Sequence, residues 1–296
     1  MNLLTLAQSY LAARLGLSRK HADDVLSVCR RCWLATGGNG QLPAQADLLK
    51  WLQSQWDRGV SRATIAHHLR ILRAVLRWGA TKGLCPPIDL PKLTSSPRVP
   101  EAWTVEEFSR LLQAAARTPG RIGQWPAKDW WPALLLTLYW TGARLSAVLS
   151  AQPSDLDWQS KVLWLRHTKN GRPKPYLLPQ QAIEAIRRVF DPDAPRLLLW
   201  PRHHSKFWAA YRAIVEAAGL PYVPYRSGTH KIRRTCLTYC WIVDPAIAQR
   251  QADHANAEVT KRHYIDPRIA LEAKTAAHVL PVPDYQPGPV QLLLFD

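Results

Sequence analysis

Apolar residues recur at helical spacing through most of the 296-residue chain, and short polar or proline-rich breaks separate these stretches. The first 85 residues follow this pattern, and beyond them it predicts helices at 129–150, 179–190, 203–218, 230–242 and 258–264. Thr104 and Glu107 have the spacing of a capping box, which predicts that a further helix begins there. Residues 162–178 have a strand-like pattern around Asn170-Gly171, a typical hairpin turn. We therefore expect a mainly α fold with a small antiparallel β-sheet.

A stretch rich in proline and serine divides the helical pattern into two parts. Its sequence, GLCPPIDLPKLTSSPRVPEAW at residues 83–103, fits neither a helix nor a strand period and is typical of a linker. The chain is long enough for two domains that each bury a core. The predicted divisions are a helical domain at 1–85, a linker at 86–103, a second domain at 104–280 and a tail at 281–296.

The whole chain is strongly basic. Its net charge is +17 and its isoelectric point is about 10.1. Residues 1–95 contain 13 basic and 5 acidic side chains, and residues 96–296 contain 26 basic and 17 acidic ones. An excess of this size on both halves indicates a polyanionic partner that is held from two sides. No apolar run is long enough to cross a bilayer, and the N-terminus lacks the pattern of a signal peptide. We therefore expect a cytoplasmic protein with no membrane partner.

One predicted helix carries part of this charge on a continuous face. The stretch from Ser61 to Trp78 is amphipathic, with Ser61 placed to cap the helix N-terminus. Four arginines lie within about 80° of each other around the helix, beside the apolar face. This arginine face consists of Arg62, Arg70, Arg73 and Arg77. A charged face is usually only solvated, but four neighbouring like charges with no acid between them favour contact with DNA phosphates.

The five cysteines are widely spread and are expected to be reduced thiols. Cys29 and Cys32 have a spacing that can bind zinc or carry out redox chemistry, but no second pair completes such a site. The segment around them also fits a helix, on which they are neighbours one turn apart. Cys236 and Cys240 likewise have helical spacing. We interpret both pairs as structural thiols.

Four segments of the back half carry residues suited to phosphate chemistry: TGARLSAVL, RHTKNGRPKPYLLP, THKIRRT and ADHANAEVTKRHYID. Arginine keeps its charge and donates two parallel hydrogen bonds, so it stabilises the charge that develops on phosphate oxygens in a transition state. Histidine and lysine can transfer protons, and an activated tyrosine can attack phosphorus. The candidates are Arg144, Lys169, His230, Arg233, His254 and Tyr264. The sequence shows neither a glycine-rich phosphate loop nor a carboxylate cluster for magnesium, so we expect no cofactor and no metal.

In their order and context, these segments closely resemble the tyrosine recombinase (phage integrase) family. The resemblance covers nearly the whole chain, and the motifs of the back half are its specific part. It implies a helical core-binding domain followed by an α-rich catalytic domain with a small sheet, the DNA breaking-rejoining fold. It also implies a bacterial or phage-encoded, nucleoid-associated recombinase or integrase that exchanges DNA strands through a 3′-phosphotyrosyl intermediate. The expected partners are a double-stranded DNA recombination site and, in the synaptic complex, a homotetramer.

The resemblance assigns a role to each candidate. Arg144 and Arg233 hold the scissile phosphate, and Tyr264 is the nucleophile. His230 donates or accepts a proton near the nucleophile, and His254 donates a hydrogen bond to a non-bridging oxygen. Lysine on the predicted hairpin protonates the leaving 5′-oxygen. Motif register favours Lys169 for this role over Lys174. We expect further DNA contacts from Lys174, Lys231 and Arg234.

The sequence departs from the family pattern at two places. Ala147 stands where the family usually has an acid, so either Arg144 is less well preorganised or another acid such as Asp155 or Asp157 supports it. Ala252-Asp253 replaces the usual Leu-Gly before the histidine, and the turn at this point can therefore differ.

Other functions also fit parts of the sequence. One is a type IB topoisomerase-like enzyme that nicks and rejoins DNA, and another is a catalytically impaired sequence-specific DNA-binding protein of the same fold. A metal-dependent nuclease would instead be sensitive to EDTA and leave free ends. In the family the C-terminal segment docks onto a neighbouring protomer. For the apolar run from Leu292 to Phe295, docking in the same subunit is an equal alternative.

Overall fold

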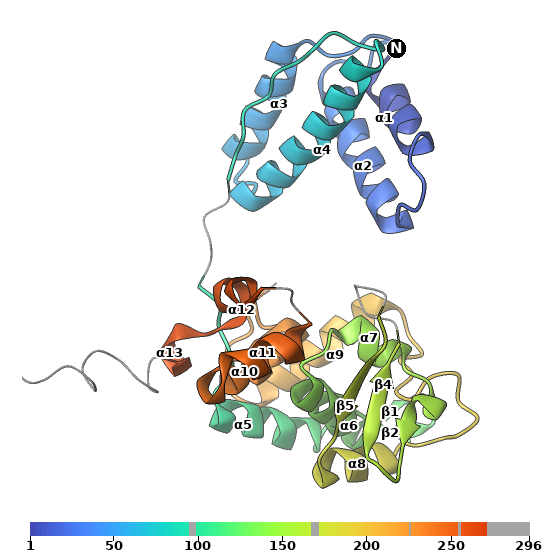
Figure 1. Cartoon of the computed structure of the whole chain (residues 1–296), viewed down its shortest axis with the longest axis vertical. Coiled ribbons are helices and arrows are strands. Elements are labelled where there is room, and N and C mark those ends of the chain that lie inside the picture. The colour runs from blue at the N-terminus through green and yellow to red at the C-terminus, as the bar shows by residue number, and fades with distance from the viewer. Residues whose placement is uncertain (95–98, 167–171, 225, 254–255, 271–296) are drawn as a thin grey trace, which may run out of the picture. The chain divides into compact units, whose positions relative to one another are not determined.

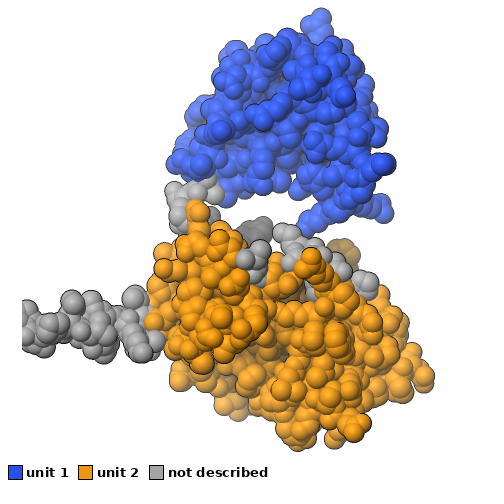
Figure 2. All heavy atoms as spheres, viewed as in Figure 1, with its two compact units in different colours: residues 1–97 blue, residues 98–296 orange. Residues whose placement is uncertain are grey.

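Helices make up most of the regular structure in the computed structural model (Figure 1). The structure describes residues 1–94, 99–166, 172–224, 226–253 and 256–270. The chain divides into two compact units, Met1–Pro97 and Arg98–Asp296, which Figure 2 distinguishes by colour. Small antiparallel sheets accompany the helices, so the predicted mainly α fold class is confirmed. Within the described ranges, no helix combines the length and the apolar character needed to span a membrane.

The first unit is built from four helices: α1 (Leu3–Ala12), α2 (Arg19–Ala35), α3 (Gln45–Asp57) and α4 (Arg62–Thr81). Their apolar faces meet in one core, to which every helix contributes buried residues. The Ser61 hydroxyl accepts a hydrogen bond from the backbone N–H of Thr64 at 3.2 Å, so the predicted N-cap of α4 is confirmed.

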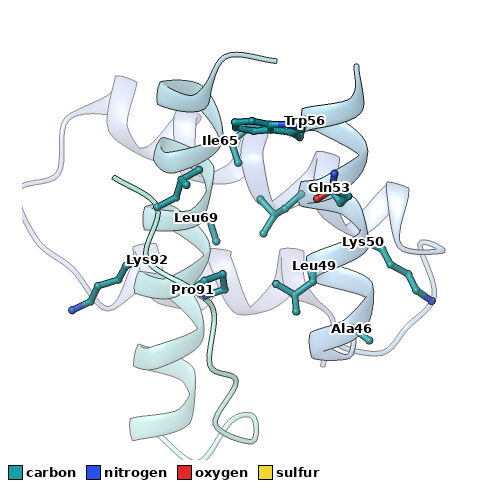
Figure 3. A pocket seen from close by; sticks show the side chains of 11 residues that line it. Ala46, Leu49, Lys50, Gln53, Trp56, Ile65, Leu69, Pro91 and Lys92 are labelled. Atoms are coloured by element: carbon teal, nitrogen blue, oxygen red, sulfur yellow. The ribbon is translucent and has the colours of Figure 1, made fainter. Parts of the chain in front are cut away.

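The chain that follows α4 packs onto the first unit. Leu90 is only 2% exposed and belongs to its core. Pro91 and Lys92 line an open apolar groove together with α3 and α4 (Figure 3). Ala102 is buried, and Trp103 belongs to the core of the second unit. Residues near both ends of the predicted linker at 86–103 are therefore buried, and scattered apolar residues in a proline-rich stretch show no period that would reveal this.

Cys29 and Cys32 are buried neighbours on α2. Burial raises the pKa of each thiol to about 12, and for Cys32 the neighbouring Cys29 adds to the effect. A thiol with so high a pKa is neither a good nucleophile nor a good metal ligand. The interpretation of this pair as structural thiols is confirmed.

His68 is a buried polar residue in the core of the first unit. Its Nδ1 lies 2.8 Å from Gln55 Oε1 and its Nε2 lies 3.3 Å from Arg31 Nη2. Because the guanidinium can only donate, Nε2 is the acceptor and Nδ1 carries the proton. Burial lowers the pKa of His68 to about 4, and the charges of Arg31 and His67 act in the same direction. The imidazole is therefore neutral at pH 7.

The depressed pKa of His68 predicts a loss of stability in mild acid. Between pH 6.5 and about 4, the unfolded state binds a proton more tightly than the folded state. The free energy of unfolding should therefore fall as the pH drops through this window, by at most about 3 kcal/mol. Urea unfolding of His68→Gln should show a shallower dependence on pH than the wild type. His67→Gln gives the comparison: His67 is only a lesser cause of the lowered pKa, so this variant should change the pH dependence less than His68→Gln does. A wild-type pH dependence for His68→Gln would contradict the prediction.

The second unit begins with α5 (Val105–Ala115), whose capping box between Thr104 and Glu107 is present as predicted. The other helices are α6 (Ala127–Thr141), α7 (Leu145–Ser150), α8 (Gln180–Arg187), α9 (His204–Ala217), α10 (Thr229–Val243), α11 (Pro245–Ala252), α12 (Ala257–Tyr264) and α13 (Pro267–Ala270), with a 3-10 turn at Pro153–Asp155. Buried α6 packs against α5, α8 and α10. The helix predicted at 129–150 is thus two helices, α6 and α7, because the chain turns between them.

Two small sheets complete the second unit. A two-stranded sheet pairs β1 (Arg121–Ile122) with β2 (Trp125–Pro126), and a three-stranded sheet has the order β3 (Leu156–Asp157), β4 (Val162–Leu165), β5 (Lys174–Leu177). The antiparallel pairing of β4 with β5 confirms the predicted hairpin. Its predicted turn at Asn170-Gly171 lies outside the described residues.

Candidate active site

The turn between α6 and α7 places Arg144. Gly142 ends α6 in the left-handed conformation, with φ 57°. A Cβ at this position would lie 2.9 Å from Cys236 Sγ on α10, so both the backbone and the space require glycine. Arg144 follows as the N-cap residue of α7 and is half-buried.

Arg233 connects this turn to the end of α11. Its side chain is buried, with 2% exposure, on α10. Nη1 donates to the carbonyl oxygen of Gly142 at 2.5 Å, and Nη2 donates to that of Ala252 at 2.8 Å. Because a guanidinium has five N–H groups, these two bonds leave donors for a further acceptor. Nε has no hydrogen-bond partner within the described residues.

The end of α11 is held against the same turn. Gln251 Nε2 donates to the carbonyl oxygens of Thr141 at 2.8 Å and Trp140 at 3.1 Å. Asp253 ends α11 in the left-handed conformation, with φ 56° and ψ 45°. Glycine adopts this conformation readily, and aspartate is among the few other residues that tolerate it. Asp253 therefore supports a left-handed turn in place of the usual glycine. His254 lies outside the described residues.

Tyr264 lies beside the basic side chains of α10. It is the last residue of α12 and is half-buried. The centre of its ring is 6.3 Å from that of His230, and Cζ of Arg233 lies 5.0 Å from the ring centre. Segments that are 31 to 34 residues apart in the sequence thus place a phenol against an imidazole and a guanidinium.

The imidazole of His230 is neutral at pH 7. Desolvation and the positive charges of Arg233, Arg234 and Arg144 together lower its pKa to about 4. The residue is exposed at the start of α10, and all of these causes act in the same direction. The charge of Arg144 thus acts on this end of α10.

The two phosphate-binding candidates repel each other. Burial lowers the pKa of Arg233, and the charge of Arg144 lowers it further, while Tyr264 opposes both through its charge and a hydrogen bond. Arg233 stays ionised because an arginine pKa begins far above neutral pH. Two backbone carbonyl groups hold Arg233 in place, and the positive charge gathered here suits an anionic ligand.

Lys174 belongs to the same cluster rather than to an open surface. Its Nζ donates to the carbonyl oxygens of Arg250 and, at 3.1 Å, of Gln251 at the end of α11. Burial lowers the pKa of Lys174, as does Arg233, while Asp253 raises it. A lysine with a lowered pKa releases its proton more easily. Lys169, which motif register favours for this role, lies outside the described residues.

Two other predicted DNA contacts on α10 have different surroundings. Lys231 is only 7% exposed, and its Nζ lies 3.5 Å from the centre of the Trp103 ring. The assignment of Lys231 to a DNA contact is therefore wrong in this structure, because its ammonium group faces the core in a cation–π contact. Helical spacing could not show this burial. Arg234 is half-buried, and its charge acts on His230.

The arginine face of α4 is only partly open. Arg62 Nε donates to the carbonyl oxygen of Thr94 at 2.9 Å, so the returning chain binds one end of the face. Arg73 is half-buried and lines a second groove with Arg77 and residues 87–90. Arg70 and Arg77 are exposed. The chain after α4 therefore shares this face, which the helical period alone could not reveal.

The acids considered as support for Arg144 are engaged elsewhere. Asp155 is buried and accepts from Arg166 Nε at 2.5 Å and from the backbone N–H of Gln152 at 2.9 Å. Asp157 accepts from Ser160 on the surface. Ala147 is buried on α7 and offers no polar group. The two acids therefore stabilise the chain around β3. The expectation that Asp155 or Asp157 supports Arg144 in place of the family acid is wrong for both.

Sequence reasoning missed several polar residues that build the site. Gln251 and Asp253 fix the end of α11, and Tyr176 on β5 is buried in the same cluster. Burial raises the pKa of Tyr176 to about 12, although Arg233 and Arg144 oppose this effect. The only signal in the sequence was the replacement of the usual Leu-Gly pair. The rest depends on contacts between separate helices.

Comparisons with known proteins agree with the fold. A family model described as the phage integrase family matches residues 102–269. The tyrosine recombinase XerA of Pyrococcus furiosus is 23% identical over 235 residues, which cover 75% of this chain and 76% of that protein. Among solved structures, a lambda integrase dimer bound to a COC′ core site has a TM-score of 0.71 at 14% identity, covering 89% of this chain and 77% of the other. A lambda integrase tetramer bound to a Holliday junction has a TM-score of 0.69 at 15% identity, covering 88% and 76%.

Proposed function

Because the chain belongs to the phage integrase family of tyrosine recombinases, we propose that it cleaves and rejoins DNA through a covalent intermediate on Tyr264. The observation that carries this proposal is the position of the phenol. Its ring lies against Arg233 and His230 of the same chain, where a bound phosphate would meet both cation and nucleophile. The site offers the positive charge that such a reaction needs around phosphorus.

In the proposed reaction, the Tyr264 oxygen attacks phosphorus and the bond from phosphorus to the 5′-oxygen breaks. A 3′-phosphotyrosyl link forms, and the other DNA end leaves as a 5′-hydroxyl. His230 accepts the phenol proton, since its pKa of about 4 keeps the imidazole neutral in the free protein. A lysine of the β4–β5 hairpin donates a proton to the leaving oxygen. The lowered pKa of Lys174 supports that residue, and motif register supports Lys169.

Arg144 and Arg233 hold the phosphate in this proposal. Arg233 keeps N–H donors beyond its two carbonyl bonds, and its Nε has no acceptor within the described residues. A buried donor without an acceptor is rare in folded proteins, so a ligand oxygen is a natural partner. The mutual repulsion of the two guanidinium groups would be relieved by one phosphate between them.

Duplex DNA and further copies of the chain are the proposed partners. The net charge of +17 supports a polyanionic ligand, and exposed Arg70 and Arg77 remain candidates for contact with its backbone. Assembly of four copies for strand exchange is proposed by similarity to the lambda integrase tetramer on a Holliday junction. The tail at 281–296, the candidate for docking between copies, lies outside the described residues.

A nicked suicide substrate tests the chemistry directly. The recombination site is first found by selecting bound fragments from DNA of the host element. The substrate then carries a nick next to the cleavage position, so that the short leaving strand diffuses away. We expect a covalent protein–DNA adduct that forms equally well in EDTA, because the transesterification uses side chains rather than a bound metal. Cleavage that stops in EDTA and leaves free ends would indicate a nuclease. Binding without an adduct would identify a catalytically impaired DNA-binding protein.

A further inference from the structure

Thr238 contacts the main chain on both sides of Ile265, the residue after the proposed nucleophile. Its side chain lies on α10 and is 0% exposed. Oγ1 donates to the carbonyl oxygen of Tyr264 at 3.2 Å and accepts from the backbone N–H of Asp266 at 3.0 Å. One hydroxyl thus uses a donor and an acceptor on the segment that leaves α12.

Asp266 ties the same segment to the core of the second unit. Its carboxylate is fully buried and accepts from the backbone N–H of Ala102 at 2.8 Å. It also accepts from Arg268 Nη2 at 2.7 Å, from Nε at 3.1 Å and from the backbone N–H at 2.9 Å. Ala102 is buried, and the next residue, Trp103, belongs to the core. The chain that follows Tyr264 is therefore anchored at two points, to α10 and to the segment before α5.

These anchors connect the nucleophile to the helix that carries its partners. The last carbonyl groups of a helix receive no hydrogen bond from an N–H of the same helix, and Tyr264 is the final residue of α12. Thr238 supplies the missing donor from α10, which also carries His230 and Arg233. One rigid helix therefore fixes both the phosphate-binding side chains and the backbone of the nucleophile.

We propose that Thr238 and Asp266 are positioning residues that hold the Tyr264 phenol against His230 and Arg233 of its own subunit. This inference rests on the proposed function. Attack on phosphorus requires the reacting atoms to approach to about 3–3.5 Å in line, and a misplacement of about 1 Å can cost on the order of 100-fold in rate. Loosening the end of α12 would displace the phenol while leaving the cationic cluster intact.

The helix offers a matched control for Thr238. Thr235 is also 0% exposed on α10, and its Oγ1 accepts from the backbone N–H of Trp103 at 2.8 Å and donates to the carbonyl oxygen of Lys231 at 3.0 Å. Valine replaces threonine with nearly the same shape, so each valine variant loses two hydrogen bonds in the core. Only Thr238→Val loses a bond to Tyr264.

The test compares single-turnover cleavage of the suicide substrate at saturating full-length protein. Thr238→Val should cleave about 10- to 100-fold more slowly than wild type, whereas Thr235→Val should cleave within about threefold of it. Both variants should bind DNA with the wild-type Kd and should lose similar thermal stability. Thr238→Ser keeps the hydroxyl and should recover most of the rate. Hydrogen exchange of the amide groups at 264–266 should accelerate in Thr238→Val alone.

The outcomes separate the positioning role from the chemistry. If the wild type cleaves and the two valine variants show equal cleavage rates and equal hydrogen exchange at 264–266, the positioning role is overturned. The proposed function then still stands. Absence of the adduct with wild-type protein overturns the proposed function and this inference with it. If Thr238→Val fails to fold, Asp266→Asn tests the second anchor. The amide has one acceptor oxygen where the carboxylate has two, so it cannot keep the bonds to the Ala102 N–H and to Arg268 together. A rate slowed by about 5- to 10-fold is expected; a wild-type rate overturns the proposal.

Discussion

Tyr264→Phe is expected to abolish the covalent protein–DNA adduct. The substitution removes only the oxygen that would attack phosphorus, and the ring keeps its place near His230 and Arg233. The reaction that we propose uses this oxygen as its nucleophile, so adduct formation should fall by more than about 10³-fold. DNA affinity should stay within about tenfold, because one hydroxyl contributes little to a large basic interface. Denaturing gel electrophoresis measures the adduct and a filter or mobility assay measures the binding.

A second tyrosine of the same cluster provides the control. Tyr176 on β5 is buried, and burial raises its pKa to about 12, which makes its phenolate rarer still at pH 7. Tyr176→Phe should therefore retain the adduct. An adduct that persists in Tyr264→Phe and vanishes in Tyr176→Phe would exchange the roles of the two residues.

Removing each arginine should abolish cleavage, but only one removal should destabilise the fold. Arg144→Ala and Arg233→Ala should each slow cleavage by at least about 100-fold, because each removes preorganised positive charge from the transition state. Arg233→Ala also leaves the carbonyl groups of Gly142 and Ala252 without their donor, at a cost of about 3 kcal/mol of stability. Arg144 is half-buried at a helix start, so its loss should change stability by less than about 1 kcal/mol.

Thermal unfolding and single-turnover cleavage of the same two variants provide the comparison. Arg144→Ala should bind DNA nearly as well as wild type, so its defect lies in the chemical step. Equal stability losses in the two variants would show that the two carbonyl bonds of Arg233 contribute nothing beyond its charge. A proportional loss of DNA binding and cleavage in Arg144→Ala would indicate a role in docking rather than in the transition state.

Local patterns predicted much of this fold because they report on a residue and its neighbours along the chain. The helical period located α9, α10 and α12 to within one residue at each end and α4 to within three, and the caps at Ser61 and Thr104 are formed as their spacing predicted. The same patterns missed α11 entirely. They also could not indicate that Lys231 is buried, since a basic residue in a basic helix gives no sign of the Trp103 ring against it.

The sequence by itself determined the chemical groups and the order in which they occur: two arginines, lysines of a hairpin, histidines and a terminal tyrosine of a short helix. The sequence did not show the left-handed turn at Gly142, because the lack of room for a Cβ there comes from Cys236 on another helix. Only the tertiary structure decided which groups meet. Arg233 donates two hydrogen bonds to the carbonyl groups of Gly142 and Ala252, and Thr238 donates one to the carbonyl group of Tyr264. Such contacts join residues far apart in the sequence, and their distances depend on how whole helices pack rather than on any local period.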